Sequence, residues 1–395
     1  MHILYFSRDY TPHDHRFLAG LARYAGKPLP EGHNLPYPKN IRDKGEGIDL
    51  PSIQKVYYLR LERGNLQTED RPIPLGVEQV SWAGGRCPVS RRQGVRLLMD
   101  LRQVIADVKP DLIQAGPLQR SAFLVALTGY QPLVSMSWGY DLLIDARRGV
   151  GWRWATRYTL KHSAALVGDC DTIRRLAVSY GMRADRIVTF PWGVDLRHFS
   201  PPTSPLEDDR TFTLLSTRAW EPLYGVTTIA QAFVTAARTE PGLCLIMLGG
   251  GSLSAELRRI FAQGGVEERV SFPGHVSYAD LKRYYQMADL YISASHSDGS
   301  SISLLEAMAC GRPALVSDIP GNREWVTPDE NGWWFSEGNA GALAEGILHA
   351  VENRRRLPEM GLAARRTAEA RADWEVNFPK IFAAYQLALE GQRDL

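Results

Sequence analysis

The sequence predicts an α/β protein made of two halves, each a parallel β-sheet flanked by helices. Three observations lead to this fold class. Short apolar segments typical of buried strands alternate with amphipathic helical segments along most of the chain, as in parallel sheets with right-handed crossovers. A segment rich in Pro and Gly interrupts this alternation near the middle of the chain. The 395 residues are enough for two domains of ordinary size.

The first half begins directly on a strand. The expected strands are His2–Ser7, Val56–Leu61, Asp111–Ile113, Pro132–Met136, Ala164–Gly168 and Ile187–Phe190. The expected helices are Arg16–Tyr24, Gln93–Val108 and Thr172–Tyr180. Residues Gly26–Pro51 are rich in Pro, Gly, Lys and Asp, a composition that predicts a long loop.

The second half restarts after a junction at Pro191–Pro202, where Pro and Gly break regular structure. The expected strands are Thr211–Ser216, Leu243–Leu248, Val270–Phe272 and Leu290–Ser293. The expected helices are Val226–Thr239, Leu253–Gly264, Tyr278–Met287, Ala340–Arg354, Arg356–Arg371 and Trp374–Glu390. We therefore expect a first domain at 1–195, a linker at 196–210, a second domain at 211–372 and a final helical segment at 373–395.

The composition is that of a globular protein, with 44% hydrophobic and 23% charged residues. The net charge of +2 gives no overall bias toward nucleic acid. No apolar run is long enough to span a bilayer, and the first residues lack the features of a signal peptide. The widely spaced cysteines favour reduced thiols in a cytoplasmic protein; they are Cys87, Cys170, Cys244 and Cys310.

The most informative segment is Ser297–Val316, in which a polar loop leads into a short helix, a Gly turn and a buried strand. The first turn of such a helix has unpaired backbone N–H groups and positive potential, which suit a phosphate. Asp298 lies in the loop and Glu306 lies two turns into the helix. Glu306 is too far along to touch the same phosphate, but it can accept hydrogen bonds from sugar hydroxyls beside the helix. One element can therefore hold a phosphate and a ribose together.

This segment resembles the acidic-x7-Glu motif of the family-4 retaining glycosyltransferases. Asp298 stands where the first Glu usually stands, and Glu306–Pro313 matches the rest of the motif. The resemblance implies a GT-B fold, in which two Rossmann-like parallel-sheet domains face a cleft and the last helix packs back on the first domain. It implies that Glu306 holds the ribose and that Asp298 is a catalytic residue beside the transferred sugar. The loop and the first turn would hold the diphosphate through Gly299, Ser300, Ser301 and Ile302.

Other donor-binding candidates follow strands of the second half, where ligands bind in open α/β sheets. Arg218 is placed to grip a diphosphate bidentately. The resemblance leads us to expect a Lys nearby, but Tyr224 stands there, which leaves the phosphate site one positive charge short. Gly250 marks either a plain turn or the edge of the site. His275 and Val276 stand where the family holds the nucleobase.

Acceptor-binding candidates follow strands of the first half. His13, Asp14 and His15 form a polar cluster after the first strand. Such a cluster can move protons, with His13 as the second catalytic candidate, or it can simply cap the next helix through Asp14. Trp138 stands where many relatives have a His; an indole cannot act as a base, but it can pack against the face of a sugar. Asp141 either caps a helix or binds a sugar hydroxyl.

Residues 147–162 are basic and aromatic. Such a segment either lies against an anionic membrane at the inner face or is a helix with one packed aromatic face and one solvated basic face.

Taken together, these features predict a retaining glycosyltransferase that needs no metal ion or cofactor. It would move a sugar from a nucleotide-sugar donor to the hydroxyl of a saccharide, a lipid-linked saccharide or a metabolite. A sugar-nucleotide epimerase or phosphorylase on the same fold is the alternative. A non-catalytic nucleotide-sugar-binding protein is a further one, because Tyr224 and Trp138 depart from the family pattern. A nicotinamide-dependent dehydrogenase is disfavoured, since no GxGxxG motif follows the first strand.

Overall fold

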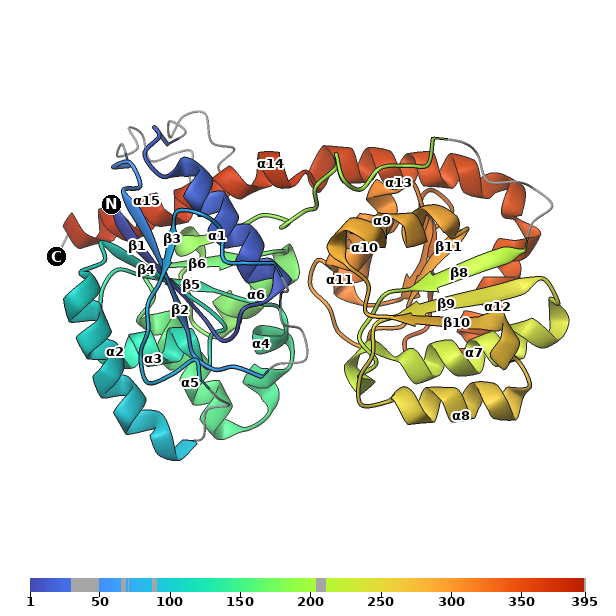
Figure 1. Cartoon of the computed structure of the whole chain (residues 1–395), viewed down its shortest axis with the longest axis horizontal. Coiled ribbons are helices and arrows are strands. Elements are labelled where there is room, and N and C mark those ends of the chain that lie inside the picture. Colours follow the sequence, from blue (N-terminus) through green and yellow to red (C-terminus); the bar gives the residue numbers. More distant parts are fainter. Residues whose placement is uncertain (30–49, 65–68, 70, 87–90, 204–210, 394–395) are drawn as a thin grey trace. The chain divides into compact units, whose positions relative to one another are not determined.

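The computed structural model describes residues 1–29, 50–64, 69, 71–86, 91–203 and 211–393. The chain divides into two compact units. Unit 1 consists of 1–190 and 378–395, and unit 2 consists of 191–377. Each unit is built around a parallel sheet with helices on both faces (Figure 1). The predicted fold class is therefore confirmed.

The sheet of unit 1 has the strand order β3-β2-β1-β4-β5-β6-β7 among the described residues, and its neighbouring strands pair in parallel. Its strands are β1 (His2–Ser7), β2 (Lys55–Arg60), β3 (Val77–Gln79), β4 (Leu112–Ala115), β5 (Leu133–Met136), β6 (Ala165–Gly168) and β7 (Ile187–Thr189). Its helices are α1 (Pro12–Tyr24), α2 (Gly94–Val108), α3 (Ser121–Thr128), α4 (Tyr140–Leu143), α5 (Val150–Lys161), α6 (Asp171–Ser179) and α15 (Ile381–Arg393).

The strand order places these helices on opposite faces. The chain moves from β1 to β2 in one direction across the sheet and from β4 through β7 in the other, and crossovers are right-handed. Helices α2, α3, α5 and α6 therefore cover one face, and α1 covers the other. Helix α15 packs beside α1, because Tyr24 contacts the rings of Phe378 and Phe382.

The sheet of unit 2 has the order β10-β9-β8-β11-β12-β13, again with parallel pairs. Its strands are β8 (Phe212–Ser216), β9 (Leu243–Leu248), β10 (Val270–Gly274), β11 (Leu290–Ser293), β12 (Ala314–Ser317) and β13 (Gly332–Phe335). Its helices are α7 (Val226–Thr239), α8 (Ser254–Gly264), α9 (Tyr278–Met287), α10 (Ile302–Ala309), α11 (Pro320–Arg323), α12 (Ala340–Glu352), α13 (Leu357–Arg371) and α14 (Trp374–Asn377). One apolar core lies under α7, α8 and α12, and another lies under α10 and α13.

The return of the chain to unit 1 differs from the expected single helix Trp374–Glu390. Helix α14 ends at Asn377, a 3₁₀ turn follows at Phe378–Lys380, and only then does α15 begin. Pro379 lies in this turn, and a proline inside a helix removes a backbone donor and clashes with the preceding turn. Helix α15 then lies against β5, β6 and β7, as the fold class predicted.

The junction between the halves also differs in detail from the expected linker. The chain enters unit 2 at Pro191, and Val194 and Phe199 are buried in the unit 2 core. Val194 pairs with Asp373 in an isolated parallel bridge. Residues 204–210 of the expected linker lie outside the described residues.

Candidate functional site

The donor-site candidates Arg218 and Asp298 follow adjacent strands of the second sheet. Arg218 follows β8 and Asp298 follows β11. The chain runs from β8 to β10 in one direction across the sheet and from β11 to β13 in the other. The point at which the chain changes direction across the sheet, the topological switch point, therefore lies between β8 and β11. Open α/β sheets bind ligands at this point, beyond the carboxyl ends of their strands.

Arg218 and the start of α10 are joined directly. The Arg218 Nη2 atom lies 2.8 Å from Oδ2 of Asp298. Its Nη1 donates to Oγ of Ser301 at 2.9 Å and to Oγ of Ser303 at 3.1 Å. The Tyr291 hydroxyl donates to Ser303 Oγ at 2.8 Å. The guanidinium therefore spans the acidic loop and the first turn of α10, where the sequence predicted a phosphate. Ser303 and Tyr291 were not predicted from the sequence: Ser303 stands at one of the variable positions between Asp298 and Glu306, and Tyr291 lies outside the motif.

Tyr224 lies against the flat side of this guanidinium. The Arg218 carbon Cζ is 4.2 Å from the centre of the tyrosine ring. A short 3₁₀ turn, Pro222–Tyr224, presents the ring, and Gly225 ends the turn with a φ of +58°. A Cβ on Gly225 would lie 2.0 Å from the carbonyl oxygen of Ala294, so only glycine fits there. At the position where the resemblance led us to expect a lysine, this chain therefore has a tyrosine that makes a cation–π contact with Arg218.

In the Arg218–Asp298 pair, each charged group favours the charged form of the other. Burial raises the pKa of the Asp298 carboxyl above its usual value, and the Arg218 charge opposes that rise. Burial lowers the pKa of Arg218 more than any other single influence, but the Asp298 carboxylate and the hydroxyls of the surrounding tyrosines together raise the pKa above its ordinary value. Arg218 Nε is buried and has no hydrogen-bond acceptor among the residues that the structure describes. The guanidinium therefore keeps one donor that no side chain of the described residues satisfies.

Glu306 is buried on α10, and its Oε2 accepts a hydrogen bond from the Tyr285 hydroxyl at 2.8 Å. Thr217 Oγ1 lies 3.1 Å from the same hydroxyl. Because the tyrosine proton is used by Glu306, Thr217 is the donor in this second bond. Tyr285 and Thr217 thus fix the orientation of the carboxylate that was predicted to hold a ribose. No sequence signal pointed to Tyr285, which lies 21 positions before Glu306.

The remaining donor-binding candidates lie in turns. The Gly250 carbonyl accepts from the Trp220 amide at 3.0 Å, so this turn packs against the segment that follows Arg218. His275 is exposed before α9, and Val276 is partly buried against the core beneath it. Beside Asp298, the Ser300 Oγ accepts from Trp325 Nε1 at 3.3 Å.

The loop between Asp298 and Ser300 packs closely against α11. A Cβ on Gly321 would lie 2.4 Å from the carbonyl oxygens of both Asp298 and Gly299. Ile302, which begins α10, is partly buried against the core under α10.

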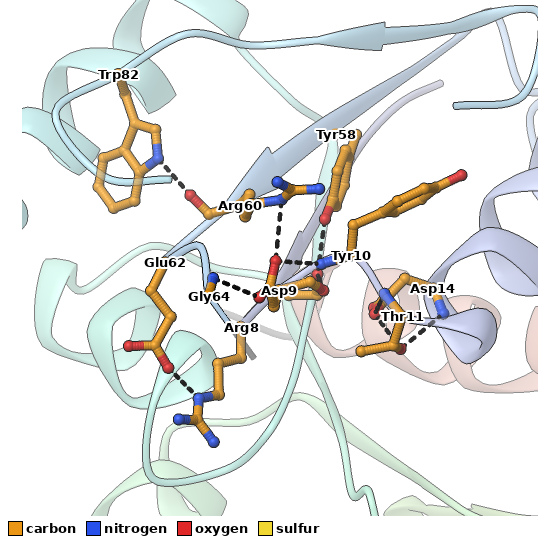
Figure 2. A network of polar contacts seen from close by, with 11 residues as sticks. Arg8, Asp9, Tyr10, Thr11, Asp14, Tyr58, Arg60, Glu62, Gly64 and Trp82 are labelled. Atoms are coloured by element: carbon orange, nitrogen blue, oxygen red, sulfur yellow. Dashed lines mark hydrogen bonds and ion pairs between the residues drawn. The ribbon is translucent and has the colours of Figure 1, made fainter. Parts of the chain in front are cut away.

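In unit 1, the segment after β1 forms a network of polar contacts with the end of β2 (Figure 2). Asp9 accepts from the amides of Tyr10 at 2.8 Å and Gly64 at 3.2 Å, and it pairs with Arg60 at 3.3 Å. Arg8 forms an ion pair with Glu62. The sequence analysis pointed to this segment through its histidines, whereas the structure places Arg8 and Asp9 at the centre of its contacts.

The histidine cluster is divided among separate contacts. Nδ1 of His15 lies 2.8 Å from the Tyr10 hydroxyl. Asp14 is buried and completes a capping box with Thr11 at the start of α1; it also accepts from the Tyr5 hydroxyl at 3.0 Å. Burial raises the pKa of Asp14 to about 6. These contacts explain Asp14 as a helix cap, and its role in binding an acceptor stays a prediction.

Trp138 and His13 meet in unit 1, with ring centroids 5.3 Å apart. Asp141 is fully buried in the short helix that follows. Its oxygens accept from the amides of Leu118 at 3.0 Å, Trp138 at 3.3 Å and Leu142 at 2.9 Å, and from Ser137 Oγ at 2.6 Å. Asp141 therefore ties two loops together from inside α4, whose N-cap is Gly139, so it does not stand at the cap position of that helix. The catalytic role of His13 and the acceptor roles of His15, Trp138 and Asp141 stay predictions.

Two further searches covered the described part of the chain. No group of three or more His, Cys, Asp or Glu side chains there could hold a metal ion. Of the helices in the described ranges, none is long and apolar enough to cross a membrane. Of the cysteines, Cys170 and Cys310 are buried and Cys244 is partly buried, whereas Cys87 lies outside the described residues.

Known sequence families cover both halves of the chain. The model of glycosyl transferases group 1 matches residues 202–367, and the model of the glycosyl transferase 4-like domain matches residues 61–193. A GDP-mannose-dependent monoacylated alpha-(1-6)-phosphatidylinositol monomannoside mannosyltransferase of Corynebacterium glutamicum is 25% identical over 52% of this chain and 57% of its own length. A GDP-mannose-dependent alpha-(1-6)-phosphatidylinositol monomannoside mannosyltransferase of Mycobacterium tuberculosis is 25% identical over 53% of this chain and 58% of its own length. The chain thus spans just over half the length of these two relatives.

Solved structures match the whole chain. Sucrose-phosphate synthase from Thermosynechococcus elongatus matches with a TM-score of 0.76 and 17% identity, over 99% of this chain and 100% of that protein. Anabaena HepE in complex with UDP-glucose matches with a TM-score of 0.71 and 19% identity, over 100% of both chains. These likenesses show a GT-B fold. With both halves matched by family models, the chain belongs to the group 1 glycosyl transferases.

Proposed function

We propose that this protein is a retaining glycosyltransferase that moves a sugar from a nucleotide-sugar donor to an acceptor hydroxyl. The observation that carries the proposal is the position of Arg218 between Asp298 and the first turn of α10, with Glu306 further along the same helix. A guanidinium beside a helix N-terminus suits a diphosphate. A buried carboxylate on the same helix suits the hydroxyls of the attached ribose.

The proposed roles follow from these contacts. Arg218 and the backbone at Ser301 and Ile302 hold the diphosphate and stabilise the charge that develops on it as the sugar leaves. Glu306, oriented by Tyr285, binds the ribose. Asp298 lies beside the transferred sugar and orients it or stabilises positive charge at the anomeric carbon. In this proposal no metal ion is required, because the cationic side chain and the helix terminus supply the positive potential.

The nature of the donor is suggested by the relatives. Two are named as GDP-mannose-dependent mannosyltransferases, and solved structures with the same fold contain UDP or UDP-glucose. We propose a nucleoside-diphosphate sugar as donor and a saccharide or lipid-linked saccharide as acceptor.

The test is thermal stabilisation and nucleotide release with a panel of UDP-, GDP- and ADP-sugars, with and without EDTA. The informative variant is Glu306→Gln, which still accepts the Tyr285 hydrogen bond but has no charge. The matched control is Glu345→Gln on the exposed face of α12. A hydrogen bond to a charged group contributes about 1.5–3 kcal/mol, so loss of the charge should weaken donor binding about tenfold or more.

Stabilisation by one nucleotide that is weakened in Glu306→Gln, normal in Glu345→Gln and insensitive to EDTA supports the proposal. Stabilisation that survives in Glu306→Gln contradicts the ribose role. Binding without any turnover over long incubation, with and without saccharide acceptors, would instead favour a non-catalytic binding protein.

A further inference from the structure

Unit 1 has two helices whose outward faces carry exposed apolar side chains surrounded by basic ones. Helices α2 and α5 both contact α3, on the face of the sheet opposite α1 and α15 (Figure 1). The sheet-facing sides of both helices are buried, so their opposite sides point away from the unit.

The outward face of α5 has a regular pattern. Its buried residues are Ala155, Thr156, Thr159 and Leu160. On the opposite side, Val150 is 84% exposed, and Trp154 is 55% exposed although one edge of its ring packs against Phe123 and Tyr158. Arg157 and Lys161 continue the same stripe and are exposed. These four positions are spaced i, i+4, i+7 and i+11, so they lie along one line of the helix.

Helix α2 repeats this arrangement. Val95 is 74% exposed and Met99 is 66% exposed, on the side opposite the buried Leu97 and Leu101. Arg92, just before the helix, and Arg96 and Arg102 within it are also exposed. A single exposed apolar residue needs no explanation, but two i, i+4 apolar pairs on the two helices that contact α3 form a pattern.

The charge of this surface differs from that of the whole chain. The chain has a net charge of +2, whereas α5 contains Arg153, Arg157 and Lys161 and no acidic residue. The acidic residues of α2 lie to one side of its outward face: Asp100 accepts from the Ala83 amide and Asp107 from Gln103. The two stripes themselves therefore carry only positive charge.

We propose that the outward face of α2 and α5 binds the surface of a bilayer that contains anionic phospholipids. Side chains with an apolar body beside arginines and lysines suit the interface of such a bilayer, and tryptophan is enriched there. The basic groups would face lipid phosphates while Val150, Trp154, Val95 and Met99 enter the headgroup region. A nucleic acid would not use the apolar centres of the two stripes. The surface is separate from the donor site, so the proposal does not depend on the proposed activity.

The experiment is flotation of the full chain with vesicles of pure phosphatidylcholine and with vesicles that also contain phosphatidylglycerol. One double variant replaces the apolar pair and the other reverses the basic pair: Val150→Glu with Trp154→Glu, and Arg157→Glu with Lys161→Glu. The matched controls are Met287→Glu with Leu362→Glu, exposed apolar residues of unit 2, and Arg238→Glu with Arg355→Glu, exposed basic residues of unit 2. Each basic residue near an anionic surface strengthens binding about fivefold, so loss of two should weaken binding at least about 20-fold.

The proposal expects binding only to the anionic vesicles, weakened by added salt and by either α5 double variant but by neither control. The Arg157→Glu with Lys161→Glu variant and both controls should keep the unfolding temperature of the wild type, since the changed residues are exposed, whereas the Trp154 variant should remain folded with a somewhat lower unfolding temperature because it loses ring contacts. Failure of the wild type to float with anionic vesicles at low salt overturns the proposal, as does unchanged binding of the α5 variants. So does sedimentation showing that the wild type alone forms a dimer that the same variants break, since the surface is then a protein interface.

Discussion

The ion pair between Arg218 and Asp298 makes a specific prediction about donor binding. Asp298 neutralises the guanidinium that we propose binds the diphosphate, so an incoming nucleotide must compete with it. Asp298→Asn removes the negative charge and keeps the size of the side chain. We expect the variant to bind the nucleoside diphosphate more tightly and to transfer sugar more slowly, because the carboxylate beside the donor sugar is lost.

The magnitude follows from distance and exposure. Two unit charges 2.8 Å apart attract by about 6 kcal/mol at an effective dielectric constant of about 20, before the cost of burying them is subtracted. The side chains of Arg218 and Asp298 are 12% and 19% exposed. The net interaction free energy of the pair therefore lies between that of an exposed ion pair, about 0–1 kcal/mol, and that of a buried ion pair, about 3–5 kcal/mol. About 1.5 kcal/mol is a reasonable middle value, which corresponds to about tenfold in Kd.

The assay is isothermal titration of UDP and GDP into the wild type and Asp298→Asn, together with initial rates of donor turnover. Asp318→Asn is the matched control, because Asp318 pairs with Arg323 on the exposed side of the same unit. A lower Kd and a lower kcat in Asp298→Asn alone are expected. Weaker nucleotide binding in Asp298→Asn would refute the reasoning, since Asp298 would then position Arg218 for the diphosphate rather than compete for it.

Two other predictions concern single side chains. Tyr224→Lys places a second cation beside Arg218 and should lower the Kd for a nucleoside diphosphate severalfold at low salt, with a smaller effect at high salt. Tyr224→Met is the control, because it removes the ring and adds no charge. If Tyr224→Lys weakens nucleotide binding as much as Tyr224→Met does, the ring contact with Arg218 matters more than the added charge. Burial raises the pKa of Asp141 to about 6, so the folded state binds this proton more tightly than the unfolded state does. The stability that this proton adds is therefore lost as pH rises through about 6. Between pH 5 and pH 7 the wild type should lose about 1 kcal/mol relative to Asp141→Asn, measured by urea unfolding, and a difference that is constant with pH would contradict the buried-carboxyl explanation.

The sequence by itself determined the architecture and the centre of the candidate site. Alternation of short apolar runs with amphipathic segments predicted two parallel sheets, because a strand and a helix each show their period locally. The motif from Asp298 to Pro313 predicted a loop, a short helix and a strand, and the structure has α10 and β12 there. Arg218 was found by its position just beyond a strand end, which is also a local signal.

The side-chain pairings were decided by the tertiary structure. Arg218 reaches Asp298 because β8 and β11 are neighbours in the sheet, although 80 positions separate the two residues. Tyr285 reaches Glu306 because α9 and α10 pack together. The basic and apolar surface of unit 1 needs α2 and α5 on the same face of the sheet, and only the strand order puts them there. Local periodicity encodes which element forms, whereas contacts between distant residues depend on how the elements are ordered in space.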